Sequence, residues 1–325
     1  MQRDVSLDVI RLIACSMIVL MHSPMPGLGT SGMVLCGISY MTAPGIGLFF
    51  MVSGALLLRG HSNPLFVTKS FLQKRFSKIL IPVVFWSLVG WGLDAQGVKN
   101  AELDVLWFMY CLSGMYLLTP ILSRWLSKAN KREIEFYLLL WMATMCVPFV
   151  KIFIPVNERD TSWLYYFHGY VGYYVLGYYL QIYVGKRDRL SVKKMIIFGL
   201  VFLLISLILP VVLLLLNVEI DFYSVFWYLS ITVALQCVVW WIVVKRLMKN
   251  VSKISNWVVN LSKLSFGIYL VHILVMRNFL WKTTWMQGMN GIVQIFVCTI
   301  LTFAISAMVS WGISKIKYVK SIVGY

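Results

Sequence analysis

The chain has 325 residues, of which 60% are hydrophobic and only 13% charged, and its mean hydropathy is +0.81. This charged share is well below the roughly 25% of a soluble globular domain, so the composition excludes a protein whose only solvent is water. The net charge of +17 does not indicate nucleic-acid binding, because the cations form short clusters between long apolar runs.

Ten apolar runs follow one another along the chain. A bilayer core of about 30 Å needs roughly 20 apolar residues per helix, and continuous apolarity indicates helices rather than barrel strands. We therefore predict an all-α integral membrane protein, a bundle of about ten transmembrane helices that forms one domain over residues 1–325. The predicted spans are residues 5–24, 35–58, 79–93, 103–122, 136–155, 164–184, 195–216, 222–244, 258–281 and 290–314.

The first run contains three ionisable residues, Asp8, Arg11 and His22. It lacks the cleavage pattern of a signal peptide, and ionisable groups inside a span are costly and mark function by default. Eleven residues along a helix return to within about 20° of the same face, so Arg11 and His22 share one stripe about 16 Å long. The alternative is an Asp8–Arg11 pair at the interface together with a packing histidine. The imidazole of His22 suits proton transfer near neutral pH.

The basic residues test the span count independently. The loops predicted at 59–78, 123–134, 185–194 and 245–257, together with the two termini, hold 22 of the 29 basic residues. The loops between them are acidic or neutral. The positive-inside rule therefore predicts that both termini are cytoplasmic.

The chain resembles the membrane-bound acyltransferase 3 family, O-acetyltransferase type, in six segments. The first is LDVIRLIACSMIVLMHS, where ten residues separate Arg11 from His22. The later segments follow in the family's order: GLFFMVSGALL (47–57), KRFSKILIP (74–82), LWFMYCLSGMYLLTPIL (106–122), GYYVLGYYL (172–180) and LSFGIYLVH (264–272).

This resemblance implies transfer of an acetyl or similar short acyl group from cytoplasmic acyl-CoA to a hydroxyl at the membrane. The acceptor would be a cell-surface glycan or a lipid-linked sugar, and the membrane the bacterial cytoplasmic membrane. The resemblance also implies that Arg11 and His22 are needed for activity. In this interpretation His22 is the general base, Asp8 orients Arg11, and no metal takes part.

The family also has a basic Arg-x-x-Arg motif before its third helix, which here reads Arg75, Phe76, Ser77 and Lys78. The second position keeps its charge but loses the bidentate guanidinium. With Lys74, these residues are candidates for binding CoA phosphates, although the positive-inside rule alone would place cations here. Ser53 could carry a covalent acyl group or only permit close helix packing.

A sugar site on the outer face is a further prediction. Its candidates are Glu102, Trp107, Tyr110 and His168. Aromatic belts at the membrane interface explain the aromatic members without any sugar. His272 lies at a position that recurs in the family, but beside Tyr269 it equally suits a structural hydrogen bond.

Two other classes of function stay open at this point. The first is a transporter or exporter of a polar solute or glycan, which the helix count favours and which the lack of a visible inverted repeat disfavours. The second is a structural or sensory membrane protein in which Arg11 and His22 only hold helices together. The six cysteines form no CxxC pair, so we interpret them as small buried hydrophobes rather than metal ligands.

Overall fold

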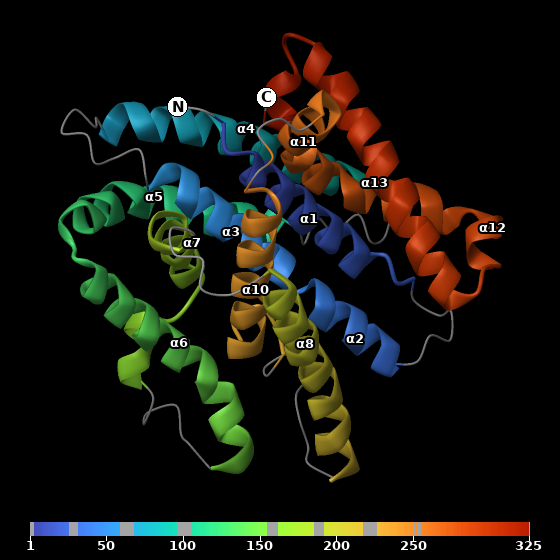
Figure 1. The fold of residues 1–325 in the computed structure, drawn as a ribbon. Coiled ribbons are helices and arrows are strands. Elements are labelled where there is room, and N and C mark those ends of the chain that lie inside the picture. The colour runs from blue at the N-terminus through green and yellow to red at the C-terminus, as the bar shows by residue number, and fades with distance from the viewer. Residues whose placement is uncertain are drawn as a thin grey trace. The chain divides into compact units, whose positions relative to one another are not determined.

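The computed structural model describes residues 3–25, 32–58, 68–95, 106–154, 162–184, 192–216, 226–249, 251 and 255–324. Every regular element in these ranges is a helix (Figure 1). The all-α prediction is therefore confirmed for the described part of the chain.

Five helical stretches in the described ranges are long and apolar enough to cross a bilayer. They are Val5–His22, Val34–Leu57, Lys131–Phe153, Asn256–Lys282 and Gly291–Lys315. These stretches are typical of a multi-pass membrane protein. The count of about ten spans and the cytoplasmic position of both termini stay predictions.

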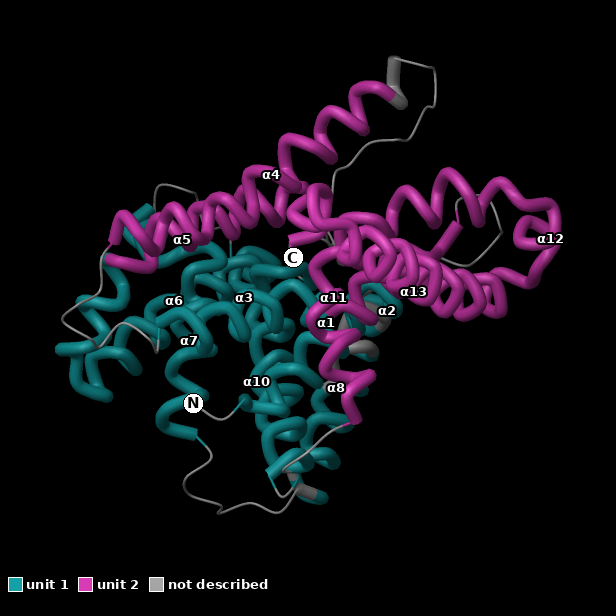
Figure 2. The backbone as a smooth tube through the Cα atoms, turned by 90° about the horizontal axis from the view of Figure 1, so that it is seen from above, with its two compact units in different colours: residues 1–14, 36–64, 121–253 teal, residues 15–35, 65–120, 254–325 magenta. Residues whose placement is uncertain are grey.

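The chain divides into two compact units built from interleaved segments (Figure 2). Unit 1 contains Met1–Ala14, Cys36–Pro64 and Ile121–Lys253. Unit 2 contains Cys15–Leu35, Leu65–Pro120 and Ile254–Tyr325. The helices α1 (Val5–His22), α2 (Gly32–Thr42) and α5 (Trp107–Lys128) each contribute to both units, so no single cut of the chain separates the units.

In unit 1, α3 (Pro44–Leu57) packs against α7 (Val171–Tyr183) through two glycines. A Cβ atom on Gly54 would overlap the backbone carbonyl of Tyr174, and one on Gly177 would overlap the carbonyl of Met51. The two backbones approach so closely because neither glycine has a side chain.

Two predicted spans are interrupted in unit 1. The span 35–58 contains two helices, because α2 ends at Thr42 and Pro44 starts α3, as proline does readily in the first turn of a helix. The span 164–184 consists of the 3₁₀ helix η3 (Ser162–Phe167) and the shorter α7.

The remaining helices of unit 1 are α6 (Lys131–Phe153), α8 (Val192–Leu215) and α10 (Ile231–Leu247), and α10 packs on α3, α6 and α8. Polar side chains set two of the starts. Asn130 and Glu133 form a reciprocal capping box at α6, and the Ser230 side chain accepts from the Val233 amide at α10.

Unit 2 contains α4 (Thr68–Ala95), α11 (Asn256–Ile273), the short α12 (Thr284–Gln287), α13 (Gly291–Lys315) and the 3₁₀ helix η6 (Lys320–Val323). α13 packs along α11, and η6 packs on α4, α11 and α13. The Trp86 indole N–H donates to the Ile322 carbonyl at 2.9 Å, which ties η6 to α4.

The prediction of a loop up to residue 78 was wrong, because α4 already begins at Thr68. Its first turns are polar, and hydropathy alone therefore did not mark them as helix.

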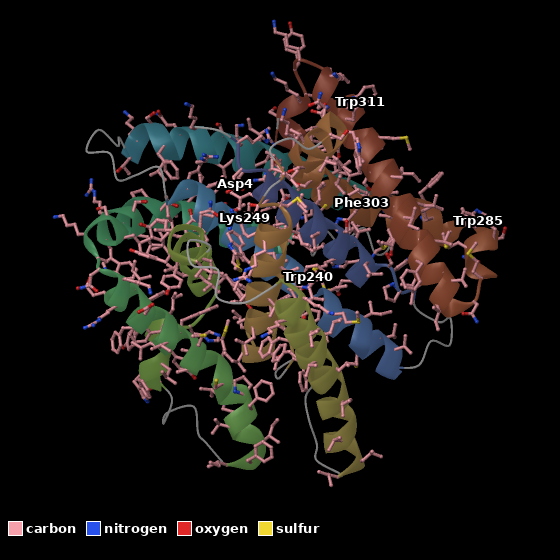
Figure 3. All side chains as sticks on the ribbon, in the orientation of Figure 1. Asp4, Trp240, Lys249, Trp285, Phe303 and Trp311 are labelled. Atoms are coloured by element: carbon pink, nitrogen blue, oxygen red, sulfur yellow. The ribbon has the colours of Figure 1, made fainter. Side chains whose placement is uncertain are left out.

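Polar side chains recur at every fourth position of α13. The buried members are Gln294, Cys298, Thr302, Ser306 and Ser310. Residues four apart lie along one row of a helix, so these side chains form a stripe. Large apolar side chains cover other parts of the helix surface, and Trp311 among them is 56% exposed (Figure 3). α13 therefore keeps its polar groups inside the protein, as a helix in hydrocarbon must.

Asp4, which precedes α1 and is labelled in Figure 3, connects three elements of unit 1 through its hydrogen bonds. Its Oδ2 atom accepts hydrogen bonds from Lys245 Nζ on α10 at 2.6 Å and from Gln181 Nε2 on α7 at 2.8 Å. Partial burial alone would raise the pKa of this carboxyl, but the hydrogen bonds from Lys245 and Ser6 and the charge of Lys245 lower the pKa to about 2. The ionised form of Asp4 is therefore favoured in the folded protein.

We expect the Asp4→Asn variant to be less stable than the wild type by about 1 kcal/mol at pH 7, since the pair with Lys245 is only half-buried. The pKa is lower in the folded state than its ordinary value of 3.8. The contribution is therefore complete above pH of about 4 and is lost as the pH falls toward about 2. Thermal unfolding in detergent at pH 7 and at pH 3 checks both points. Lys245→Met should add little on top of Asp4→Asn, and additive losses would contradict the pairing.

Candidate active site

α1 is one unbroken helix from Val5 to His22, as the sequence predicts, and it carries Asp8, Arg11 and His22. Asp8 is 5% exposed and accepts two hydrogen bonds from the Arg3 guanidinium, at 2.6 Å from Nε and 2.8 Å from Nη2. The sequence paired Asp8 with Arg11 and did not identify Arg3 as its partner. A bidentate contact of this kind fixes the orientation of the carboxylate.

His22 is the last residue of α1, and its ring makes a hydrogen bond to its own helix. The Nδ1 atom lies 2.8 Å from the Ile18 carbonyl oxygen. Because a carbonyl can only accept, Nδ1 carries the proton in the neutral ring. The Nε2 atom then carries the ring's lone pair, which is the basic group of a neutral imidazole.

His272, near the end of α11, lies against His22 within unit 2. The two ring centroids are 5.2 Å apart, and the ring planes meet at 63°. His272 is fully buried, and its Nδ1 atom lies 2.5 Å from the Tyr269 carbonyl oxygen. Its Nε2 atom has no hydrogen-bond partner in the described part of the chain. The His272 ring therefore makes a hydrogen bond with the Tyr269 carbonyl, and it also contacts the His22 ring.

Two residues of α13 fix the end of α1 next to His22. Gln294 Nε2 donates to the Ser23 carbonyl at 3.1 Å, and the Thr299 hydroxyl donates to the Ser23 hydroxyl at 2.8 Å. The Cys298 thiol lies beside Ser23 and beside the Trp281 indole. His22 therefore lies at the edge of a polar cluster formed by α1, α11 and α13.

The match to the family model for the acyltransferase domain extends over residues 4–311, nearly the whole chain. The chain belongs to the acyltransferase 3 family. None of the curated proteins and none of the solved structures gives a significant match to it. Together with the apolar helices, the family makes this protein a membrane-bound acyltransferase.

Lys74, Arg75 and Lys78 of this acyltransferase lie on α4, in unit 2, and not in the loop that the sequence predicted. The side chains of Lys74 and Lys78 are exposed, and the Arg75 guanidinium lies 5.8 Å from the centre of the Phe71 ring. A helix spaces charges at positions i and i+4 along one side, so Lys74 and Lys78 can bind one anion together. Ser53 lies half-buried on α3, in unit 1.

The acceptor candidates of the acyltransferase do not all fall in one unit. Trp107 and the 59%-exposed Tyr110 begin α5 in unit 2, and the exposed His168 lies between η3 and α7 in unit 1. The prediction for Glu102 falls outside the described residues. Phe108, the neighbour of Trp107, contacts the Tyr269 ring at a centroid distance of 5.3 Å. Trp107 is therefore the chain neighbour of a residue that contacts Tyr269, and the Tyr269 ring in turn contacts the His272 ring.

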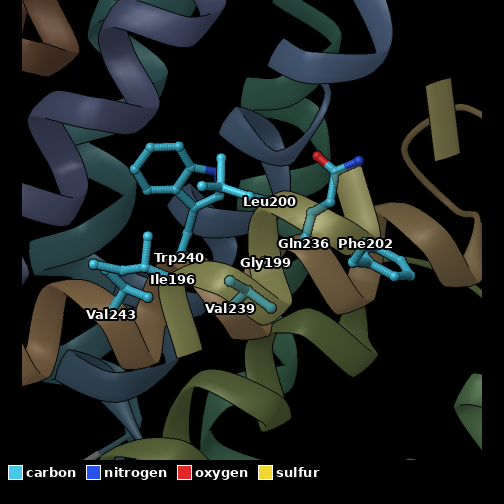
Figure 4. Close-up of a pocket in the computed structure, with 8 residues that line it drawn as sticks. All are labelled: Ile196, Gly199, Leu200, Phe202, Gln236, Val239, Trp240 and Val243. Atoms are coloured by element: carbon cyan, nitrogen blue, oxygen red, sulfur yellow. The ribbon is translucent and has the colours of Figure 1, made fainter. Parts of the chain in front are cut away.

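A cavity of about 150 Å³ lies between α8 and α10 in unit 1. Its lining residues are Ile196, Gly199, Leu200, Phe202, Gln236, Val239, Trp240 and Val243 (Figure 4). None of these side chains can ionise, so the cavity offers no group for acid–base catalysis. In the described residues there is also no group of His, Cys, Asp and Glu side chains that could hold a metal ion.

Four residues of this cluster were not predicted from the sequence: Ser23, Trp281, Gln294 and Thr299. A signal for the α13 residues was present, since Gln294, Cys298 and Thr302 recur every four positions in an otherwise apolar run. Trp281 gave no signal, because a tryptophan near the end of a span is typical of the membrane interface.

Proposed function

We propose that this acyltransferase transfers a short acyl group, most simply acetyl, from cytoplasmic acyl-CoA to a hydroxyl of a cell-surface glycan or a lipid-linked sugar. The membrane would be the bacterial cytoplasmic membrane. The observation that carries the proposal is the hydrogen bond from His22 Nδ1 to the Ile18 carbonyl. This bond leaves Nε2 as the basic atom of an imidazole in a polar cluster, as general-base catalysis requires.

In the proposed reaction the acceptor hydroxyl gives its proton to His22 Nε2 while its oxygen attacks the thioester carbonyl carbon. A carbon–oxygen bond forms, and the carbonyl oxygen takes up negative charge. The carbon–sulfur bond then breaks, the carbonyl re-forms, and the protonated His22 returns the proton to the leaving thiolate. The products are the acyl ester and free CoA, and the histidine returns to its neutral state.

Arg11 and the basic residues of α4 are proposed to bind the donor. Arg11 lies on the same helix as His22, and Asp8, whose carboxylate is held by Arg3, is proposed to orient Arg11. Lys74, Arg75 and Lys78 offer cations for the phosphates of CoA. Ser53 is a weaker candidate for contact with the donor. Trp107, Tyr110, Glu102 and His168 are proposed to bind the acceptor sugar, for which aromatic and carboxylate side chains are suited.

The experiment is an acyl-CoA assay on the purified full-length protein in detergent, with free CoA and acylated acceptor as readouts. We expect CoA release that depends on an added glycan or lipid-linked sugar acceptor. Arg75→Glu should raise the KM for acyl-CoA roughly tenfold or more, since a charge-assisted contact is replaced by repulsion. Arg124→Glu, the same charge change on exposed α5 surface, should leave KM unchanged.

Two results would contradict the proposal. One is the absence of CoA release and of acylated product across acetyl, succinyl and longer acyl-CoA donors, which would favour transport of a polar solute instead. The other is turnover whose KM for acyl-CoA is the same in Arg75→Glu and Arg124→Glu, which would remove the α4 cations from the donor site.

A further inference from the structure

The helix that carries His272 changes its winding immediately after that residue. α11 ends at Ile273, and the chain continues as a π-helical turn η4 (Leu274–Phe279) and a 3₁₀ turn η5 (Leu280–Lys282). π-helical turns are rare, and they occur frequently at functional sites. Asn278 lies in the π-helical turn, and Trp281 lies in the 3₁₀ turn that follows it.

Both residues carry a buried hydrogen-bond donor that meets no oxygen or nitrogen acceptor. This holds for the Asn278 Nδ2 atom and the Trp281 Nε1 atom within the described part of the chain. Leaving such a donor unpaired is destabilising, and buried polar groups in native proteins are nearly always satisfied. An indole N–H can only donate, so the group that satisfies it has to be an acceptor.

The Trp281 donor lies near the proposed base. The Cys298 thiol lies beside the Trp281 indole and also beside Ser23, the residue that follows His22. The indole N–H meets this thiol, which is only a weak acceptor. His272, whose ring contacts His22, precedes the π-helical turn by two residues. Trp281 therefore belongs to the polar cluster beside His22 in unit 2, and Asn278 lies three residues before it in the chain.

We propose that the Trp281 indole N–H and the Asn278 amide bind the acyl carbonyl oxygen and stabilise the negative charge that builds up on it. This inference rests on the proposed function. When the acceptor oxygen bonds to the carbonyl carbon, the carbonyl electron pair moves to its oxygen, while the hydroxyl proton goes to His22. Hydrogen-bond donors that are already in place around such an oxygen contribute strongly, because they need no reorganisation during the reaction.

The proposal is tested by a substitution that should lower the activity without lowering the stability. Trp281→Phe removes the N–H and keeps most of the aromatic ring. We expect kcat to fall about 10²-fold with little change in KM, as for the loss of one such donor. We also expect the melting temperature to stay equal or rise, since a buried donor without an oxygen or nitrogen acceptor has been removed. Asn278→Leu should behave in the same way.

Trp285→Phe on α12 is the matched control, because Trp285 is 47% exposed and only four residues away. It should leave kcat unchanged. If the wild type transfers acyl groups and Trp281→Phe keeps an undiminished kcat, the inference is overturned and the proposed function is not. A lower melting temperature together with the lower kcat also overturns it, because the indole N–H would then be a structural donor. Wild-type protein that releases no CoA would instead overturn the proposed function on which the inference rests.

Discussion

Acyl transfer falls by about 10² to 10⁴-fold when His22 is replaced by glutamine, if the imidazole is the general base. The fold should survive, because the hydrogen bond of the ring to Ile18 lies within its own helix and the side chain is only half-buried. Initial rates of CoA release and size-exclusion profiles of the purified variant measure the two effects separately. Met21→Leu, a volume-conserving change at the adjacent position, is the control and should keep nearly full activity.

The pH dependence provides a second readout for the same residue. In the wild type, kcat/KM should decline toward acid pH, because a protonated ring cannot accept the hydroxyl proton. The remaining activity of His22→Gln should lack this acid limb. A glutamine variant that transfers acyl groups at the wild-type rate would remove His22 from the chemistry.

The largest effect on stability is expected for Gly54→Ala. The added methyl group would overlap the backbone carbonyl of Tyr174, and backbone cannot move aside as the end of a flexible side chain can. The variant can fold only if α3 and α7 separate, which we expect to cost about 3 kcal/mol or more. Most of the expressed protein should then aggregate. A smaller monodisperse fraction on size-exclusion chromatography measures this loss.

The matched control is Gly114→Ala on α5. No atom outside the neighbouring helix backbone lies within 4 Å of a Cβ built at this position. Because alanine is the better helix former by about 1 kcal/mol, this variant should be as stable as the wild type or more stable. Equal melting temperatures for Gly54→Ala and the wild type would show that α3 and α7 do not pack through these glycines.

Hydropathy predicted the helical class correctly because lipid leaves the backbone no other way to satisfy its polar groups. It was less accurate at the helix ends. The first turns of α4, with Lys69, Lys74 and Arg75, are helical although they are polar, and the break at Ala43 depends on Pro44 within an apolar run. Apolar content indicates which residues can enter lipid, but it does not indicate where a helix begins or is interrupted.

The candidate site was only partly predictable for a related reason. Arg11 and His22 stood out because ionisable residues are rare in a span, and the family motif names both. The contact between His22 and His272 joins residues 250 positions apart in the chain, and no local pattern indicates it. The partnership of Asp8 with Arg3 was missed because Arg3 lies before the helix, outside the i, i+3 spacing on which the sequence argument relied.

The stripe on α13 has a consequence for how the protein is assembled in the membrane. A uniformly apolar helix could rotate about its long axis in the bilayer at almost no cost. Rotation of α13 by half a turn would expose Gln294, Thr302 and Ser306 to hydrocarbon, where nothing could accept or donate hydrogen bonds. The recurring hydroxyl and amide groups therefore give this span one azimuth when it docks on α11, and so direct Gln294 and Thr299 toward the end of the first helix.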